Sequence, residues 1–574
     1  MAKDFDSYEL RVVKGVPYYG GVISGHFYPI GLGVWVDYVI ETFDTSEFTM
    51  KISYRISESN EEIRSCIFSS KEMSLKGYVH YNSLGVDVTY RTQQLFEAYI
   101  NSERRKATEY IYNHKFLGWC RHNNLLIYRH QTATIGKKTS TYTGDFEIAP
   151  KGTYRAWING VKKHILGHYP LEAALAIGLS AVTVGYFSQT GQPRNLMFHI
   201  AGNSSTGKST ASMLAISTTG SPEINQNQSR SLMKTWNTTE NAIYGLLRGN
   251  HGAVLCLDEM GVRTQKNIGQ IIYKLSAGID KERLDKDAKL TKDTQPSWST
   301  TIISTGEIPL ANLMKDKADG VMMRCFEFSN LKTIVWNPDT KKWTIKSTKW
   351  TKSAQNAENI QRFVRENYGH AAPKLAQYIL KLDKEKPGTI QKAYEECCQF
   401  YRERRNMDDG FTDRKAEFLG FVLLTARLIK AGLGLSINWK TIAKFFIVNE
   451  REQKPEYLQA YEAIQNLYVT NKQCFWNSGE PDQKLSSFWG TIQKKNSKIP
   501  ENGKTVTYEI AFLTDILKRE LQKCGFPNAD RVLRQLKKYG YLSYDGDRLT
   551  RKRSDPRNSD IKLLYYVIRI FEDK

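Results

Sequence analysis

The residues Gly202 to Ser209, GNSSTGKS, have the types and spacing that bind nucleotide phosphates. Two glycines let a loop wrap its N–H groups around phosphate oxygens, and a helix starting at the loop's end presents its positive end to them. Lys208 would neutralise the β- and γ-phosphates, and Ser209 would bind Mg²⁺. The predicted nucleotide-binding residues are Gly202, Asn203, Ser204, Ser205, Thr206, Gly207, Lys208, Ser209 and Thr210.

Apolar runs surround this loop in the way that a parallel sheet requires. MFHIA (197–201) leads into the loop, and STASMLAIS follows with helical character. Two more apolar runs, at 253–257 and 300–305, alternate with helical segments between residues 171 and 330. This pattern predicts buried strands covered on both faces.

Two carboxylates, Asp258 and Glu259, come directly after the run at 253–257. Alone they fit a solvated turn at the end of a strand. Beside a phosphate loop, Asp258 would hold Mg²⁺ through water and Glu259 would polarise the attacking water. The loop therefore favours a catalytic interpretation of both acids.

The run at 300–305 ends in hydroxyl side chains at the edge where open α/β sheets bind ligands. Thr305 or Ser304 would contact the γ-phosphate or the attacking water, and Glu307 is a further candidate. Arg324 stands at the start of another apolar run, a position more typical of an ion pair than of a catalytic group. The residues alone leave these choices open.

The segment from Lys281 to Trp298 has few apolar residues and includes Lys286, Lys289 and Lys292. It fits a solvated connector and, equally, a β-hairpin that offers lysines to DNA phosphates.

The C-terminal pattern is helix (about 508–523), turn, helix (529–539), strand, charged loop, strand (561–571), which is the order of a winged helix. Basic residues on its second helix and wing favour duplex-DNA binding over a merely solvated face. They are Arg531, Arg534, Lys537, Lys538, Arg551, Lys552 and Arg553.

Composition points to a polyanionic partner, with nucleic acid first, because the 574 residues carry a formal net charge of +22. The most apolar window, 171–187, contains a glutamate and predicts a buried helix rather than a membrane span. The N-terminus has no apolar signal region, so we expect a cytoplasmic protein. The eight cysteines lack metal-ligand spacing.

The fold class predicted is multidomain α/β. An α+β domain at 1–150, with a helix at about 92–114, precedes an ATPase core at 151–335. A helical lid and connecting region follow at 336–480, and the winged helix at 500–574.

The segments FHIAGNSSTGKST, TWNTTENAIYGLL, VLCLDEMG, STGEIPLANLM and VMMRCFEF resemble a helicase-like ATPase family of bacterial mobile elements. The family includes the helicases of staphylococcal cassette chromosomes and the replication initiators (Rep) of staphylococcal pathogenicity islands, which are similar in plan to MCM helicases. The resemblance implies an AAA+ P-loop core that uses ATP and Mg²⁺, forms a homo-oligomeric ring, typically hexameric, and moves on single-stranded DNA.

The same resemblance implies roles for single residues. Arg324 matches an arginine finger acting in trans, and a pre-sensor hairpin would place Lys286 and Lys289 in the pore. The second sensor arginine stays open among Arg362, Arg365 and Arg414. The function predicted is a DNA helicase and replication initiator whose winged helix recognises a duplex origin. The alternatives are an ATP-switched initiator that melts or marks DNA without translocating, and an assembly or signalling ATPase without DNA.

Overall fold

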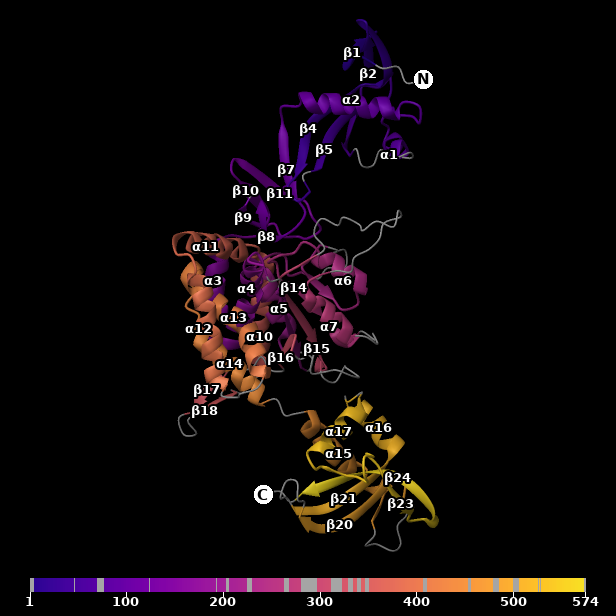
Figure 1. The fold of residues 1–574 in the computed structure, drawn as a ribbon, viewed down its shortest axis with the longest axis vertical. Helices are drawn as coiled ribbons and strands as arrows, with labels where there is room; N and C mark the ends of the chain where they lie inside the picture. The colour runs from indigo at the N-terminus through magenta and orange to yellow at the C-terminus, as the bar shows by residue number, and fades with distance from the viewer. Residues whose placement is uncertain are drawn as a thin grey trace. The chain divides into compact units, whose positions relative to one another are not determined.

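The computed structural model divides the chain into two compact units, whose described residues lie within 5–146 and 147–571 (Figure 1). The described residues are 5–45, 47–69, 77–122, 124–191, 194–202, 206–223, 230–262, 268–279, 297–310, 323–328, 334–337, 342–345, 350–405, 410–452, 456–477, 485–498, 505–524, 526 and 528–571.

The described residues of the N-terminal unit form three sheets and two helices, α1 (Gly77–Ser83) and α2 (Gln93–Lys106). One sheet is the antiparallel meander β1 (Ser7–Val13), β2 (Val16–Ile23), β3 (His26–Leu32), and another is the pair β8 (Gly118–His122), β9 (Leu125–Arg129). The largest has the order β10-β11-β7-β4-β5-β6. Its strands are β4 (Val34–Thr42), β5 (Glu47–Arg55), β6 (Ile63–Phe68), β7 (Tyr110–His114), β10 (Thr132–Ile135) and β11 (Lys138–Tyr142).

The helix predicted at about 92–114 is correct only in its first part. Helix α2 ends at Lys106, and Tyr110–His114 forms strand β7 between β4 and β11. The residues YIYNH have β-branched and aromatic side chains that suit a sheet, and pairing on both sides outweighs the helical pattern before them.

A buried ion pair lies in this unit, between Asp44 and Arg129, whose side chains are 1% and 2% exposed. The Asp44 carboxylate also accepts the backbone N–H groups of Lys115 and Phe116. Nearby, His114 is held between the Ser140 hydroxyl and the His130 carbonyl, each 2.7 Å away. Burial lowers the pKa of His114 to about 4, so the ring is neutral at pH 7.

The second unit contains a five-stranded sheet of order β13-β14-β15-β12-β16, in which every pair is parallel. All carboxyl ends therefore meet at one edge. The strands β12, β14 and β15 coincide with the three apolar runs, and their side chains are buried along their whole length. The strands are β12 (Leu196–Ala201), β13 (Met233–Thr235), β14 (Leu255–Asp258), β15 (Thr301–Gly306) and β16 (Cys325–Phe328).

Helix α4 (Tyr169–Ser188) is the core helix beside this sheet and packs against α5, α13, α14 and β15. Among the described residues it is the one helix long and apolar enough to cross a membrane, and 83% of that stretch is buried within the protein. The buried helix predicted from the sequence is therefore present. The other helices around the sheet are α3 (Tyr154–His164), α5 (Lys208–Ser217), α6 (Glu240–Leu247) and α7 (Ile268–Ala277).

In the described part of the chain, a strand pair and five helices follow the sheet. Figure 1 shows α11–α14, in orange, gathered on the side of the sheet opposite α6 and α7. Helix α13 packs against α4, α11, α12 and α14, while α10 packs against α3 and α5. The elements are β17 (Ile334–Asn337), β18 (Lys342–Ile345), α10 (Trp350–Glu366), α11 (Ala371–Glu385), α12 (Thr389–Arg405), α13 (Gly410–Leu433) and α14 (Trp439–Glu452).

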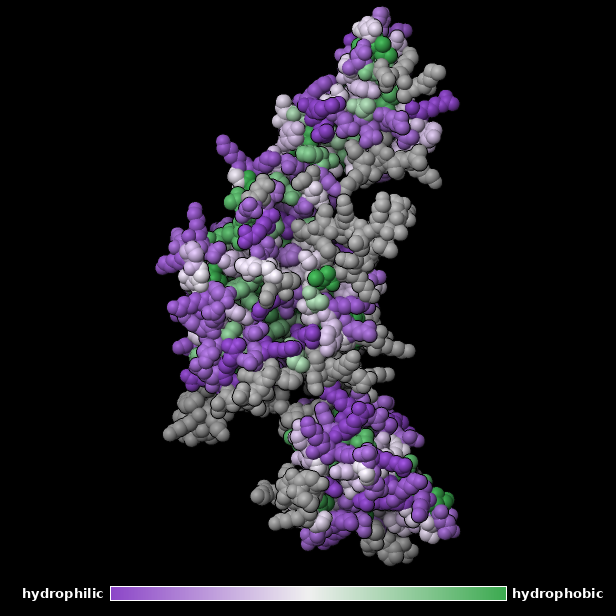
Figure 2. Space-filling model, in the orientation of Figure 1, coloured by the Kyte–Doolittle hydropathy of each residue, from purple (hydrophilic) through white to green (hydrophobic). Residues whose placement is uncertain are grey.

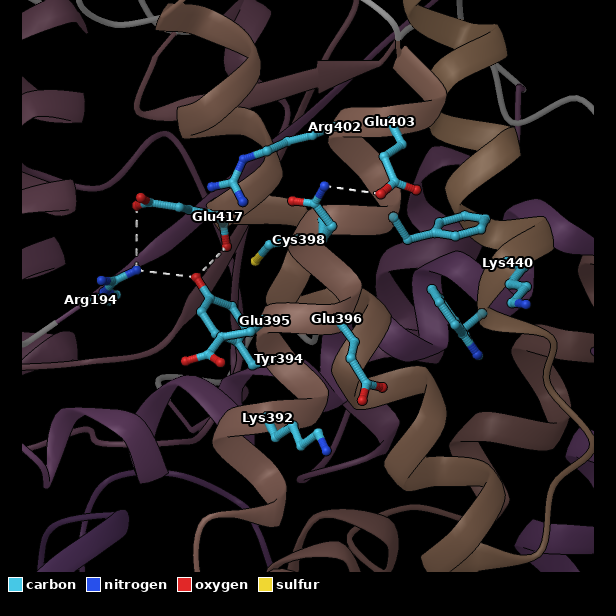
Figure 3. Close-up of a pocket in the computed structure, with 13 residues that line it drawn as sticks. Arg194, Lys392, Tyr394, Glu395, Glu396, Cys398, Arg402, Glu403, Glu417 and Lys440 are labelled. Carbon is cyan, nitrogen blue, oxygen red and sulfur yellow. Dashed lines mark hydrogen bonds and ion pairs between the residues drawn. The ribbon is translucent and has the colours of Figure 1, made fainter.

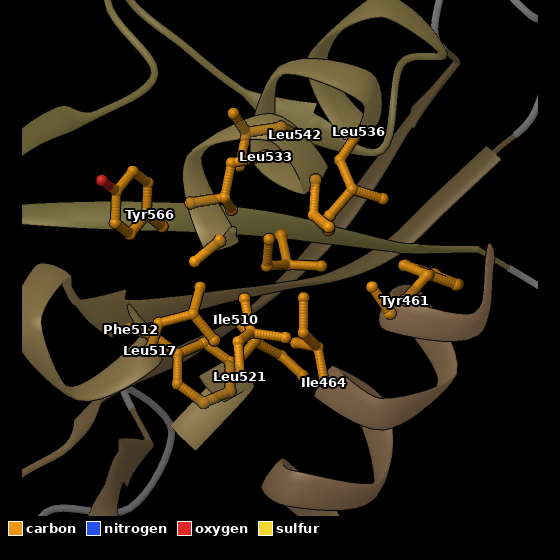
Figure 4. Packing of buried hydrophobic residues seen from close by; sticks show 14 of the residues in the cluster. Tyr461, Ile464, Ile510, Phe512, Leu517, Leu521, Leu533, Leu536, Leu542 and Tyr566 are labelled. Carbon is orange, nitrogen blue, oxygen red and sulfur yellow. The ribbon is translucent and has the colours of Figure 1, made fainter. Parts of the chain in front are cut away.

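The C-terminal part forms a separate core, in which side chains from helices and sheet converge (Figure 4). Its sheet has the order β19-β20-β21-β24-β22, and β23 pairs with β24 as a hairpin. The elements are α15 (Glu456–Thr470), β19 (Phe475–Asn477), β20 (Gly490–Lys498), β21 (Thr505–Leu513), α16 (Thr514–Lys523), α17 (Ala529–Lys538), β22 (Leu542–Ser543), β23 (Arg551–Asp555) and β24 (Asn558–Phe571).

Two sequence predictions about this part were wrong. The helix expected from about 508 begins at Thr514, because TVTYEIAFL is strand β21 and pairs with both β20 and β24. The boundary expected at residue 500 also lies too late. Tyr461 and Ile464 of α15 are buried in the same core as Leu517 and Leu533, so the folded part starts with α15.

Replacing Asp44 with alanine should destabilise the N-terminal unit by about 3–5 kcal/mol, because Arg129 would remain buried without its carboxylate. Hydrogen exchange of the β4 and β7 amides measures this local loss. Asp37→Ala is the matched control, since its carboxylate lies on the surface near Ser53 and Lys51. Equal protection in both variants would contradict the role given to Asp44.

Candidate active site

The phosphate loop occupies the turn between β12 and α5. Gly207 has a φ of +88° and lies directly before Lys208, the first residue of the helix. A left-handed conformation of this kind costs glycine little. The N–H groups of the helix start therefore face the loop, as anion binding requires. Asn203, Ser204 and Ser205 lie outside the described residues.

Lys208 is tied to the beginning of the loop. Its Nζ donates to the Gly202 carbonyl at 2.7 Å, and the Gly202 N–H donates to the Gly306 carbonyl at 3.1 Å. Burial lowers the pKa of Lys208, while the nearby carboxylates of Glu307 and Asp258 act in the opposite direction. The negative charges of Glu307 and Asp258 thus favour the protonated form of Lys208.

Asp258, at the end of β14, joins the loop helix to the neighbouring strand. The carboxylate is buried; one oxygen accepts the Thr305 hydroxyl, and the other lies 3.4 Å from the Ser209 hydroxyl. The described residues contain no group of three or more His, Cys, Asp or Glu side chains that could hold a metal. Ser209 and Asp258 fit Mg²⁺, which usually takes one or two carboxylates and completes its shell with water and substrate phosphates.

Glu259 is exposed and has a φ of +61°, which is unusual for a residue other than glycine. Its N–H donates to the Thr305 hydroxyl oxygen at 3.1 Å. Such a conformation costs on the order of 1–3 kcal/mol and persists where surrounding contacts hold it. Thr305 therefore bonds both acidic residues at once, accepting from Glu259 and donating to Asp258.

Ser304, the alternative to Thr305, lies on the opposite face of β15. Its hydroxyl is 3.0 Å from Trp236 Nε1 and 2.9 Å from His199 Nδ1, and all three residues are buried. The structure thus brings Thr305, and not Ser304, to the two acids. Sequence reasoning missed His199 and Trp236, since each is a single side chain within a segment whose pattern signals only burial.

Arg324 lies at the other edge of the sheet, next to the start of β16. Cys325 pairs with Met197, so Arg324 lies level with Leu196, five residues and about 16 Å before the end of β12, where the loop begins. Its guanidinium stacks 4.3 Å from the Tyr273 ring centre. A cavity of about 500 Å³ contains Arg324 together with Arg194 and Arg414. Arg324 is therefore not brought to Lys208 of the same chain.

The remaining basic candidates are the three lysines of the segment 281–298 and the two arginines of helix α10. Lys286, Lys289 and Lys292 lie outside the described residues. Helix α10 contacts the loop helix through Gln361, which donates to the Thr210 hydroxyl at 2.8 Å. Arg362 and Arg365 of the same helix are exposed.

A second cavity, of about 720 Å³, opens on the helices α12, α13 and α14 (Figure 3). Figure 3 shows Arg194 between the Glu417 carboxylate, 3.6 Å away, and the Tyr394 hydroxyl, 3.3 Å away. Acidic and basic side chains line it in similar numbers, so its charge selects no class of ligand. Sequence analysis did not predict this cavity.

The seven basic residues proposed to contact DNA differ in their surroundings. Arg534, Lys538 and Lys552 are exposed. Arg553 instead forms an ion pair at 2.5 Å with Glu509, whose side chain is 8% exposed, and Arg551 pairs with Asp545 at 3.0 Å. Lys537 donates to the Gly546 carbonyl. Figure 2 shows hydrophilic residues over α16 and α17.

Comparisons with known proteins agree with this architecture. Residues 34–295 match the family model of a domain of unknown function, DUF927, and residues 457–573 match that of the Cch helix turn helix domain. No curated protein matches the sequence. A solved structure titled "SCCmec type IV Cch - active helicase" matches with a TM-score of 0.59 and 18% identity, over 100% of this chain and 98% of that one.

The chain has the fold of the Cch helicase over its whole length. The resemblance stated from the sequence is confirmed by this match and by the Cch helix turn helix domain. That domain begins at residue 457, in agreement with the inclusion of α15 in the C-terminal core.

Arg534→Ala should weaken duplex-DNA binding and reduce the slope of log K against log salt by about 1, with no loss of stability, because the side chain is exposed. Arg553→Ala should instead destabilise the domain by about 3–5 kcal/mol, since it leaves Glu509 almost buried and unpaired. Fluorescence anisotropy across a salt series and thermal unfolding measure the two effects. A loss of stability in Arg534→Ala, or a loss of DNA binding without a loss of stability in Arg553→Ala, would contradict these roles.

Proposed function

We propose that the chain is an ATP-dependent DNA helicase and replication initiator of a bacterial mobile element, with an AAA+ motor that works in the cytoplasm as a ring. The observation that carries the proposal is the arrangement of Lys208, Ser209, Asp258, Glu259 and Thr305 at one edge of a parallel sheet. The match to the fold of an active helicase supports it.

In this proposal each residue has a separate task at the γ-phosphate. Lys208 neutralises the β- and γ-phosphates, and Ser209 and Asp258 hold Mg²⁺, which when bound neutralises further phosphate charge. Glu259 polarises the attacking water. Thr305 fixes the relative positions of the two acids through its hydrogen bonds to both.

Arg324 serves the site of a neighbouring subunit in this proposal. About 16 Å of strand separates it from the loop of its own chain, farther than an arginine side chain extends. An arginine near the transferred phosphate stabilises the charge of the transition state and can be supplied in trans. A homo-oligomer, typically a hexamer, brings each Arg324 to another chain's loop.

The charge distribution supports DNA as the partner of the later parts of the chain. Residues 1–150 contain 17 basic and 17 acidic side chains, so the whole excess of +22 lies in residues 151–574. We assign single-stranded DNA to Lys286 and Lys289 in the pore, with Lys292 as a further DNA-binding residue of the same segment. Duplex origin DNA is assigned to the winged helix through Arg534, Lys538 and Lys552, with Arg531 beside them.

Mixed subunits test the shared ATP site. Arg324→Ala and Lys208→Ala proteins should each hydrolyse ATP at a few per cent of the normal rate or less. Their mixture should recover activity, because some interfaces then combine an intact loop with an intact arginine. Steady-state ATPase across mixing ratios measures the recovery. An unchanged rate at every ratio would falsify the trans assignment.

Strand displacement separates the helicase from an initiator that melts or marks DNA without moving. Changing Lys286 and Lys289 together to alanine should abolish unwinding of forked DNA and leave basal ATPase within about twofold, since the loop residues are untouched. Lys14→Ala, in the N-terminal unit, is the control. Wild-type protein that hydrolyses ATP and displaces no strand would favour the non-translocating initiator.

A further inference from the structure

Three buried side chains from separate elements form one continuous chain of hydrogen bonds beneath the candidate active site. Trp236 follows β13, Ser304 lies on β15 and His199 on β12. Trp236 Nε1 is 3.0 Å from the Ser304 hydroxyl, which is 2.9 Å from His199 Nδ1, and His199 Nε2 is 3.3 Å from the Ile308 carbonyl. The three side chains are fully buried.

The chemistry of the end groups fixes the direction of every bond. An indole N–H only donates, so Trp236 donates to Ser304. The Ser304 proton is then available for His199 Nδ1, which accepts it, and the Nε2–H of the neutral ring donates to Ile308. Burial lowers the pKa of His199 to about 4, which agrees with a neutral ring. Each donor in the chain therefore has its own acceptor.

This series of hydrogen bonds is connected at three points to the carboxyl edge of the sheet, where the candidate site lies. The backbone N–H of Trp236 donates to the backbone carbonyl of Asp258 at 2.9 Å. Ser304 directly precedes Thr305, whose side chain faces the acids from the other side of the strand. The His199 ring lies against Gly306, where an added Cβ would come within 3.1 Å of the ring, and the Gly306 carbonyl accepts from the loop at Gly202.

We propose that Trp236, Ser304 and His199 are positioning residues that hold the end of β15 so that Thr305 meets Asp258 and Glu259. They contact neither the phosphates nor the water themselves. Without them β15 keeps its ladder, while the angle of its last residues relative to the loop is no longer fixed. The inference rests on the proposed ATP hydrolysis and adds to it the residues that set its rate.

Two variants test this hydrogen-bond relay of Trp236, Ser304 and His199. Trp236→Phe removes the indole N–H that donates to Ser304, and Ser304→Ala removes the hydroxyl that bonds both Trp236 and His199. Each should lower kcat for ATP about tenfold, as a small misplacement of catalytic groups does, and leave KM and nucleotide affinity within about twofold. The double variant should be no slower than the slower single variant by more than about twofold, since both changes break the same bond.

Ser180→Ala is the matched control. Its hydroxyl is 2.8 Å from that of Thr301, at the opposite end of the same strand, and both are buried. Thermal unfolding should show a comparable loss of stability in Ser180→Ala and Ser304→Ala, because each removes one buried hydroxyl. Only the latter should lose kcat, because only the relay is next to Thr305.

The outcomes separate the relay from the proposed function. If Trp236→Phe and Ser180→Ala reduce kcat equally, or if the relay variants lose nucleotide binding together with hydrolysis, the three residues are structural and the inference is overturned. If wild-type protein binds ATP and does not hydrolyse it, the proposed function fails, and the relay with it. Normal kcat in both relay variants overturns the relay alone.

Discussion

The bonds that Thr305 makes to the two acids are the constraint on which the candidate site depends. One hydroxyl donates to the buried Asp258 carboxylate and accepts the N–H of Glu259, whose backbone is in a costly conformation. These bonds form only if β14 and β15 are adjacent and parallel with their carboxyl ends level, as their register shows. The register of the parallel sheet thus fixes the positions of the site residues, and the helices around the sheet keep its strands buried.

Much of this arrangement could be predicted because it is local in sequence. The loop, the apolar strands and the acids after β14 are contiguous patterns, and the buried helix α4 is a single apolar run. The choice between Ser304 and Thr305 depends on which face of β15 each occupies. Both faces of the strand are buried, so the sequence shows no alternation that would assign each residue to a face. Strands β7 and β21 were missed because one partner of each strand, β4 for β7 and β24 for β21, lies far away in the chain.

The basic residues of the C-terminal domain differ in whether an acidic side chain pairs with them, which the sequence alone does not show. A run such as RKR appears uniform in sequence, yet alternate residues of a strand face opposite sides. Arg551 and Arg553 therefore pair with Asp545 and Glu509, whereas Lys552 is exposed. Glu509 precedes Arg553 by 44 residues, so its pairing depends on the β21–β24 sheet. Counting charges overestimates the cations available to DNA, and the sheet decides which ones remain.

The positions of loop and arginine also constrain any assembly of the proposed motor. The phosphate loop lies at the carboxyl edge of the sheet and Arg324 near the amino edge, so the sheet of one chain holds the two apart. A twofold dimer that paired the arginine of each copy with the loop of the other would stop at two subunits, whereas a head-to-tail interface repeats through every subunit and either closes into a ring or continues as a filament. Under the trans assignment, every closed interface holds one complete ATP site. In this proposal, the geometry of a single sheet couples ATP hydrolysis in one subunit to the placement of its neighbour.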